Sequence, residues 1–334
     1  MESQIPTSDT MRLTIVGPQF FSYVDGIVSH IDSLGIPVQA IDERGSQSFF
    51  IKSIFRSYYL KKLFSLVIKK KHKDIIKKSI EFESTHVLFI SPESVNSNLI
   101  ESMKNEGLKV ILYMWDSFDN KPSARTCIDV FDKAATFDPV DAQIHKLNVI
   151  NLFAEDYFFN VNRNDCFSRK IDISFVGTVH SSRPKIIKKL VTNPRFSSFN
   201  KKMYLYRGNY YYYLRALLIT GFSRCTPLSK SSISKSAVAE IFNNSKYVLD
   251  ITHSSQRGLT SRTFEALASG SVLVTNNLWS RELLPKFSGQ IILFEDIELL
   301  ELSHKGINIS EQPHTDMYSL TLSRFCNDIL ELAQ

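Results

Sequence analysis

The chain has 334 residues, which is too long for one ordinary core and suits two domains. A hydrophobic share of 43% excludes a disordered protein, and four cysteines with no pair at Cys-x-x-Cys spacing exclude a zinc module or a disulfide framework. The N-terminal residues lack the basic and apolar regions of a secretory signal, and no apolar run reaches the ~18 residues that a spanning helix needs. We therefore expect a cytoplasmic protein.

The formal net charge of +6 is concentrated in two zones. Residues 51–80 hold ten Lys or Arg against one acidic residue, and residues 183–215 hold nine and no acidic residue. Such zones favour an anionic partner, which can be a membrane surface, a lipid diphosphate or a nucleic acid. Because no helix-turn-helix, zinc-finger or RRM pattern accompanies them, we expect no nucleic-acid partner and keep nucleic-acid binding as an alternative.

The first half of the chain reads as alternating strands and helices. Residues 12–16 (RLTIV) predict a strand, Gly17-Pro18 a turn, the residues to about 34 a helix and 36–41 a second strand. Further buried strands are predicted at 85–91, 109–113 and 133–137, each followed by a polar turn. In an open parallel sheet such turns form the ligand crevice. Gly17 stands alone without the spacing of a dinucleotide or P-loop motif.

Residues 49–82 predict one long or broken helix that is both apolar and basic. The basic part, 52–78, can lie on an anionic membrane surface. The alternative is a helix that packs its apolar face on the sheet and leaves its lysines in water.

Asp116 follows the strand at 109–113 and lies next to Trp115. Partial burial at a strand end would raise its pKa toward the range useful for a general base. The alternative is a helix cap or an Asx-turn, the commoner task of Asp in such a place.

The second half begins after a polar, turn-rich linker at 160–169. Residues 172–176 predict a strand, Gly177-Thr178 its turn, and Arg183 the start of a helix where it can contact phosphate. Residues 203–206 predict the next strand, which Arg207 and a run of tyrosines at 210–213 follow; these tyrosines favour either a membrane interface or a partly buried helix.

Residues 247–275 predict a strand, a polar loop, a helix, a glycine and a buried strand. Thr260 or Ser261 can cap the helix, and its N-terminus favours an anion, with Arg257 and Arg262 as guanidinium donors for a diphosphate. Glu265, one turn inside the helix, can accept hydrogen bonds from a ribose diol, or it is an ordinary surface residue. A short helix at 279–284, a strand at 290–294 and a terminal helix at about 315–333 complete the chain.

The stretch RGLTSRTFEALASG resembles the donor-binding segment of GT-B glycosyltransferases, and most of all their CgeB-like branch. Further segments are similar to the same family: YMWDS at 113–117 with TFDPVDA at 136–142, and FVGT at 175–178 with the later Arg183-Pro184. The resemblance implies that Glu265 holds the nucleotide ribose. Many retaining GT-B enzymes carry another Glu eight residues earlier, where this chain has Arg257, so the stereochemical outcome stays open.

The resemblance implies an α/β protein with two Rossmann-like domains that face each other across a cleft. Residues 1–165 would form the acceptor-binding domain and 166–312 the nucleotide-sugar donor-binding domain. Residues 313–334 would form a C-terminal helix that crosses back to the N-terminal domain.

The implied activity is a metal-independent hexosyltransferase that moves a sugar from a nucleotide-diphosphate sugar, with UDP favoured, to a hydroxyl of a growing glycan. The acceptor would be an oligosaccharide or lipid-linked, as in capsule or O-antigen synthesis, and the protein would be peripheral on the cytoplasmic face of the inner membrane. No Asp-x-Asp triplet is present, so we expect no metal and no cofactor. The alternatives are a GT-B-shaped sugar-nucleotide epimerase and a non-catalytic nucleotide-binding or glycan-binding protein.

The predicted site has one catalytic residue, Asp116, and a set of donor-binding residues in the second half of the chain. The donor-binding residues are Gly177, Thr178, Arg183, Arg207, His253, Arg257, Gly258, Leu259, Thr260, Ser261, Arg262 and Glu265.

Overall fold

The computed structural model describes residues 11–17, 23–44, 58–159, 163–179, 182–206, 214, 218, 228–229, 231–252, 257–287, 289–295, 302 and 317–334. The chain forms two compact units. The first comprises Met1–Asn151 with Leu322–Gln334, and the second Leu152–Thr321.

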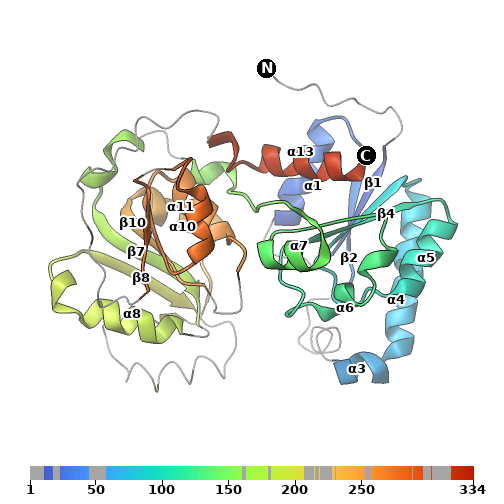
Figure 1. Ribbon diagram of the computed structural model, residues 1–334, viewed down its shortest axis with the longest axis horizontal. Helices are drawn as coiled ribbons and strands as arrows, with labels where there is room; N and C mark the ends of the chain where they lie inside the picture. Colours follow the sequence, from blue (N-terminus) through green and yellow to red (C-terminus); the bar gives the residue numbers. More distant parts are fainter. Residues whose placement is uncertain are drawn as a thin grey trace. The chain divides into compact units, whose positions relative to one another are not determined.

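The first unit is built on a six-stranded parallel sheet in the order β2-β1-β3-β4-β5-β6 (Figure 1). Its strands are β1 (Leu13–Gly17), β2 (Val38–Asp42), β3 (His86–Ile90), β4 (Lys109–Met114), β5 (Lys133–Thr136) and β6 (Asn148–Val149). The five longer strands lie where the apolar runs predict them, because strands buried on both faces need continuous apolar residues. The two-residue β6 was not predicted, since Asn148 and Val149 are both exposed.

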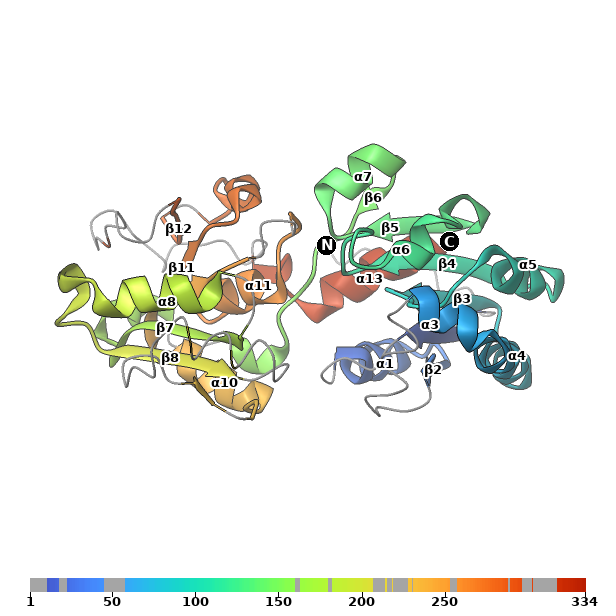
Figure 2. The same ribbon diagram turned by 90° about the horizontal axis from the view of Figure 1, so that it is seen from below.

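Helices cover both faces of this sheet (Figure 2). The helices of the first unit are α1 (Tyr23–Ser33), α3 (Tyr58–Leu63), α4 (Ser65–Glu81), α5 (Ser97–Asn105), α6 (Pro122–Arg125) and α7 (Pro139–His145), with a 3-10 turn η1 (Ile128–Val130), and α3 packs on α4. The helices α4 and α5 pack on the face whose core holds Phe89, Leu99 and Val110. The basic helix predicted over 49–82 is broken at Phe64, and its residues before 58 lie outside the described part of the chain.

The C-terminal helix α13 (Leu322–Ala333) belongs to the first unit, as predicted. It packs on α1 and β5, and the Phe325 ring meets the buried Tyr113 ring edge-on at 5.2 Å. Residues 317 and 318 are helical, and a turn at 319–320 and the bridge of Thr321 with Ala154 separate them from α13. The prediction of a return crossing is therefore confirmed, and the predicted terminal helix is interrupted at residues 319–321.

The second unit is also built on a six-stranded parallel sheet, in the order β12-β11-β10-β7-β8-β9. Its strands are β7 (Ile171–Thr178), β8 (Lys201–Tyr206), β9 (Leu228–Ser229), β10 (Ser245–Asp250), β11 (Val272–Thr275) and β12 (Ile291–Leu293). The helix α8 (Arg183–Thr192) covers one face, and α10 (Lys235–Asn243) packs beside α11 (Ser261–Ala268) on the other (Figure 2). The remaining turns are 3-10: η2 (Asp156–Phe158), η3 (Arg163–Ser168), η4 (Pro194–Phe196) and η5 (Leu278–Leu283).

Two predicted features of the second unit differ in detail. The short helix predicted at 279–284 is the 3-10 turn η5, opened by Asn277, whose side chain accepts from the Trp279 N–H. The polar stretch predicted as a linker contains η3, and its Cys166 is buried in the second core. The buried Cys166 side chain packs this otherwise polar segment against the core of the second unit.

At two glycines of the first unit an added Cβ would have opposite effects on the free energy of unfolding. A Cβ on Gly17 would lie 2.6 Å from the Ile90 carbonyl oxygen, whereas a Cβ on Gly26, inside α1, would make an ordinary contact 3.6 Å from Leu322. We expect Gly17→Ala to lower the free energy of unfolding by about 1–3 kcal/mol through overpacking. Gly26→Ala should raise it by about 1 kcal/mol through helix propensity. Urea unfolding of both variants checks this, and equal effects would contradict the contacts.

Candidate functional site

The predicted donor residues gather at the carboxyl edge of the second sheet. There β7 ends at Thr178, β8 at Tyr206 and β10 at Asp250, and α11 begins directly after the loop that follows β10. In an open parallel sheet this edge is where ligands bind.

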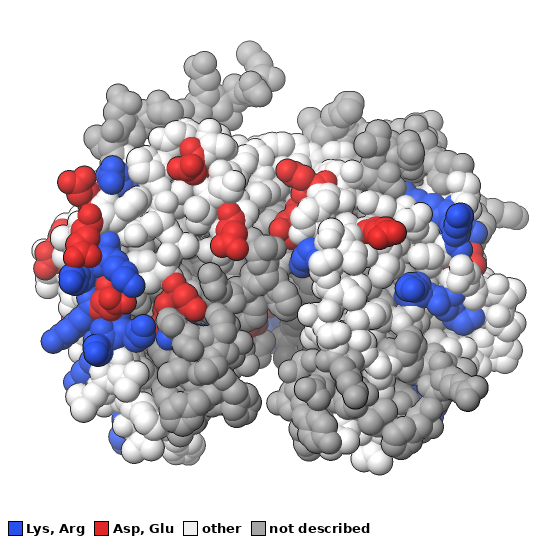
Figure 3. All heavy atoms as spheres, turned by 180° about the vertical axis from the view of Figure 1, so that it is seen from behind, with Lys and Arg blue, Asp and Glu red and all other residues white. Residues whose placement is uncertain are grey.

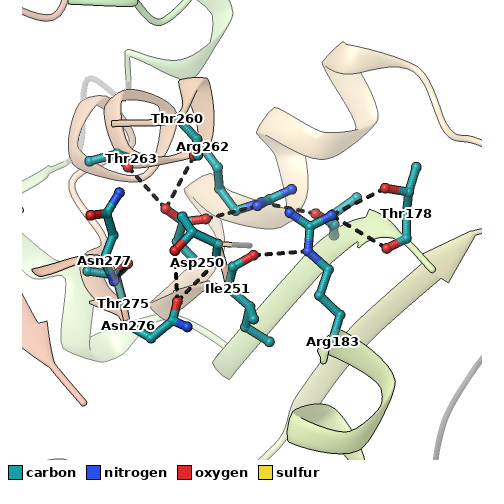
Figure 4. A network of polar contacts seen from close by, with 12 residues as sticks. Thr178, Arg183, Asp250, Ile251, Thr260, Arg262, Thr263, Thr275, Asn276 and Asn277 are labelled. Atoms are coloured by element: carbon teal, nitrogen blue, oxygen red, sulfur yellow. Dashed lines mark hydrogen bonds and ion pairs between the residues drawn. The ribbon is translucent and has the colours of Figure 1, made fainter. Parts of the chain in front are cut away.

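Asp250, which sequence reasoning missed, is the centre of the site (Figure 4). Its side chain is fully buried, so its charge must be balanced inside the protein. One carboxylate oxygen accepts from Arg262 Nη1 at 2.9 Å, and the other accepts from the hydroxyls of Thr260 at 3.2 Å and Thr263 at 3.0 Å. The carboxylate therefore fixes the start of α11 against β10.

Arg262 is held by a second strand as well. Its Nε donates to the Val176 carbonyl at 3.1 Å, and its guanidinium lies 5.2 Å from the centre of the Phe175 ring. A Cβ on Gly177 would lie 2.9 Å from that ring and 3.1 Å from Arg262 Nη2. The absence of a side chain at Gly177 therefore makes room for Arg262 and Phe175.

The Arg183 guanidinium also lies near this ring, 5.8 Å from the ring centre. Its Nε donates to the Ile251 carbonyl at 2.9 Å and its Nη1 to Thr178 Oγ1 at 3.2 Å (Figure 4). Burial, helped by the nearby charge of Arg262, lowers the pKa of Arg183 to about 9. A bound anion would oppose both effects, because it would favour the charged guanidinium.

The loop before α11 positions the helix start. Thr260 is the N-cap, as predicted, but its hydroxyl donates to Asp250 and makes no cap hydrogen bond. Gly258 and Leu259 are buried, and the Gly258 carbonyl accepts from Asn277 Nδ2 at 3.1 Å. Arg257 is exposed, and Ser261 is the first residue of the helix.

Glu265 is buried in α11 and forms an ion pair with Lys235, the first residue of α10. The Lys235 ammonium lies 5.7 Å from the centre of the Phe158 ring. Glu265 is therefore not the ordinary surface residue that the sequence left open. Lys235 and Phe158 come from distant segments, and no sequence signal pointed to them.

Two predicted donor residues, Arg207 and His253, lie outside the described residues.

The predicted catalytic residue, Asp116, lies at the carboxyl edge of the first sheet, after β4. Its Oδ1 accepts from the Ser117 N–H at 3.0 Å and from Asn120 Nδ2 at 2.9 Å, which is the turn geometry that was the alternative. Its Oδ2 has no hydrogen bond to any residue in the described ranges.

A buried charge cluster lies at the same edge and was missed. Glu93, after β3, accepts from Arg44 Nε at 2.8 Å and forms ion pairs with Arg44 and Lys121, while Glu43 Oε1 accepts from the Glu93 N–H at 2.6 Å. Glu43 and Arg44 directly follow β2, and that position at a strand end was the available signal.

The two carboxyl groups of this cluster have opposite pKa shifts. Burial raises the pKa of Glu43 to about 7, and the charge of Glu93 adds to the rise. Burial also opposes the ionisation of Glu93, but its hydrogen bond from Arg44 and the charge of Lys121 outweigh burial and lower its pKa to about 2. Glu93 is therefore ionised at neutral pH, whereas Glu43 gains and loses its proton near neutral pH.

The described part of the chain contains no group of three or more His, Cys, Asp or Glu residues that could hold a metal ion. It also contains no helix with the length and apolar character needed to cross a membrane.

A glycosyl transferase-like family model matches residues 220–312, a range that includes α10, α11 and Asp250. The chain has the GT-B fold, and residues 220–312 form a glycosyl transferase-like segment within it. No curated protein matches its sequence.

Solved structures similar to this GT-B protein cover nearly all of the chain. A glycosyltransferase from Rickettsia africae ESF-5 has a TM-score of 0.63 at 10% identity, covering 97% of this chain and 98% of that one. The α,α-trehalose-phosphate synthase (UDP-forming) of Burkholderia xenovorans, solved with glucose-6-phosphate, has 0.60 at 10%, covering 97% and 100%. The UDP-GlcNAc 2-epimerase of Methanocaldococcus jannaschii has 0.52 at 11%, covering 96% and 99%. At these identities the likeness shows the fold.

The Glu43 carboxyl gives a stability prediction whose sign follows from its raised pKa. Since its pKa rises from 4.5 in the unfolded chain to about 7 on folding, the folded state loses stability as pH rises between these values. Glu43→Gln keeps an acceptor for the Glu93 N–H and removes the titration. The stability of the variant relative to the wild type should therefore increase between pH 4.5 and 8, by up to about 3 kcal/mol.

Urea unfolding at several pH values measures this difference. Asp116→Asn is the matched control, and its difference from the wild type should not follow the same curve. A Glu43→Gln difference that stays flat from pH 4.5 to 8 would contradict the raised pKa.

Proposed function

We propose that this protein is a glycosyltransferase that moves a sugar from a nucleoside-diphosphate sugar to a hydroxyl of a growing glycan. The observation that carries the proposal is the cluster at the start of α11, where Arg183, Arg262 and the helix N-terminus converge beside Glu265. Guanidinium groups and a helix N-terminus stabilise a departing diphosphate without a metal. Glu265 would accept hydrogen bonds from the ribose hydroxyls.

We favour UDP as the nucleotide of the donor. Among the similar structures, the Burkholderia xenovorans synthase is described as UDP-forming, and the Methanocaldococcus jannaschii enzyme is a UDP-GlcNAc 2-epimerase. The latter also supports a second candidate, a sugar-nucleotide epimerase. Transfer is favoured over epimerisation because a glycosyl transferase-like model matches the segment that contains α11.

Asp116 is the proposed general base for an inverting transfer. Its Oδ1 is held by two hydrogen bonds, so its Oδ2 has a fixed direction from which to accept the proton of an acceptor hydroxyl. The acceptor oxygen would form the new bond to the anomeric carbon as the bond from that carbon to the diphosphate breaks. In a retaining reaction Asp116 would only orient the acceptor.

We propose further that the acceptor is lipid-linked and that the protein reaches it from the cytoplasmic membrane face through α3 and α4. The helix α4 buries Ile68 and Ile75 on the core, so the packing alternative holds for that face. Outside it, Tyr59, Leu63 and Leu66 are 82%, 74% and 79% exposed. Large apolar side chains at such exposure beside lysines suit the boundary between lipid headgroups and acyl chains.

The basic side chains of the first unit support this surface. Figure 3 shows Lys and Arg side chains gathered on one flank of the molecule, with acidic residues among them. The exposed lysines of α3 and α4 are Lys62, Lys69, Lys70, Lys73, Lys77 and Lys78. Each basic residue near an anionic surface contributes roughly 1 kcal/mol to binding.

The donor proposal is tested by a thermal-shift panel of UDP, GDP, ADP, dTDP and a short DNA duplex, without Mg²⁺. One nucleoside diphosphate should stabilise the protein selectively, by roughly 2.7 kcal/mol at a hundred times its dissociation constant. Glu265→Gln should weaken its affinity by about tenfold, because a charged hydrogen-bond acceptor is lost. Asp116→Asn should keep that affinity and lose transfer.

A response to DNA alone, or to none of the ligands, would contradict a nucleotide-sugar site. Turnover of the bound donor to a free C2-epimer, with no transfer to any glycan, would favour the epimerase instead.

The membrane proposal predicts weaker vesicle binding when the apolar residues are removed. Leu63→Ser with Leu66→Ser should reduce binding to phosphatidylglycerol vesicles by at least about tenfold, since two apolar side chains no longer leave water. Ile144→Ser is the matched control, because Ile144 is 64% exposed in α7 of the same unit, and it should leave binding unchanged. Lys69→Glu with Lys70→Glu should weaken binding to these vesicles but not to phosphatidylcholine vesicles. Equal sedimentation of all variants would refute the proposed surface.

A further inference from the structure

Tyr206 is the last residue of β8 and lies at the carboxyl edge of the second sheet. It pairs with Thr178 at the end of β7, and its carbonyl accepts from the Val179 N–H at 2.9 Å. This pairing places Tyr206 beside Thr178, whose Oγ1 accepts a hydrogen bond from Arg183. The residue thus ends on the same edge as the guanidinium groups of the proposed donor site.

The phenol of Tyr206 lies among the charges of that site. It is half-buried and interacts electrostatically with Arg262, Arg183 and Glu265. Burial raises its pKa, although the two guanidinium charges oppose the rise. The hydroxyl therefore keeps its proton at neutral pH and is available as a hydrogen-bond donor.

Two donors of this group are unused within the described part of the chain. The Tyr206 hydroxyl makes no hydrogen bond there, and Arg262 Nη2 makes none either. The other two nitrogens of that guanidinium, Nε and Nη1, donate to Val176 and Asp250. The neighbouring Tyr204 differs, since its hydroxyl has hydrogen-bond partners within the protein, Ser229 Oγ at 2.8 Å and the Ser231 carbonyl oxygen at 3.1 Å. Unused donors that share one charged environment are what an anionic ligand requires.

We propose that Tyr206 binds the donor, its hydroxyl donating a hydrogen bond to a phosphate oxygen of the nucleoside diphosphate alongside Arg262 Nη2. This inference rests on the proposed function and adds a residue that the sequence did not single out. A phosphate oxygen fits better than a ribose hydroxyl, because both unused groups are donors and the flanking charges of Arg183 and Arg262 are positive. Glu265, the acceptor beside them, is the group that suits the ribose diol.

The test is calorimetry with wild type, Tyr206→Phe and the matched control Tyr204→Phe. The probes are whichever of UDP, GDP, ADP and dTDP stabilises the wild type most, together with its monophosphate and its nucleoside. Tyr206→Phe should weaken binding of the diphosphate by roughly 10- to 100-fold, since a hydrogen bond to a charged group is lost, and leave binding of the nucleoside unchanged. Tyr204→Phe should change neither.

The outcomes separate this inference from the proposed function. A wild-type protein that binds a nucleoside diphosphate, with equal affinity for Tyr206→Phe, would overturn the role of Tyr206 alone. Equal weakening of diphosphate and nucleoside would also overturn it, because that pattern indicates a structural role for the residue. No binding of any nucleoside diphosphate by the wild type would overturn both.

Discussion

The buried carboxylate of Asp250 is the constraint on which the carboxyl edge of the second sheet depends. A fully buried charge needs a counter-charge and hydrogen bonds, and Asp250 takes them from Arg262, Thr260 and Thr263. These bonds bind the first turn of α11 to the end of β10. The direction of the helix N-terminus and the position of the Arg262 guanidinium both follow from them.

The first unit also has a buried, ion-paired carboxylate at the carboxyl edge of its sheet. Glu93 after β3 gathers Arg44 and Lys121 from the segments after β2 and β4. In each unit a buried carboxylate fixes one or two cationic side chains from neighbouring segments. This removes rotamer freedom that long side chains would otherwise lose on binding a ligand. The units differ in the outcome. Glu43 adds a carboxyl with a raised pKa to the first, whereas in the second a donor of Arg262 and one of Tyr206 have no hydrogen-bond partner among the described residues.

The fold was largely predictable because its signals are local. Apolar runs such as those at 109–113 and 247–249 identify buried parallel strands, and the return of α13 to the first unit agrees with the family resemblance. Predictions failed where a few residues decided the structure. The short strand β6 lacks an apolar run, and the terminal helix is interrupted where Thr321 pairs with Ala154.

The sequence by itself determined the two α/β units, the strand ends that carry polar residues and the position of Thr260 at the start of α11. Only the tertiary structure decided which of those polar groups serve the protein and which remain for a ligand. The sequence predicted Arg262 as a phosphate contact, yet two of its nitrogens hold Asp250 and Val176. Lys235, the partner of Glu265, comes from α10, and Tyr206, which we propose as a ligand contact, comes from β8. The reason is that a buried charge takes its partner from whatever segment packing brings near, and packing joins residues that are far apart in the chain.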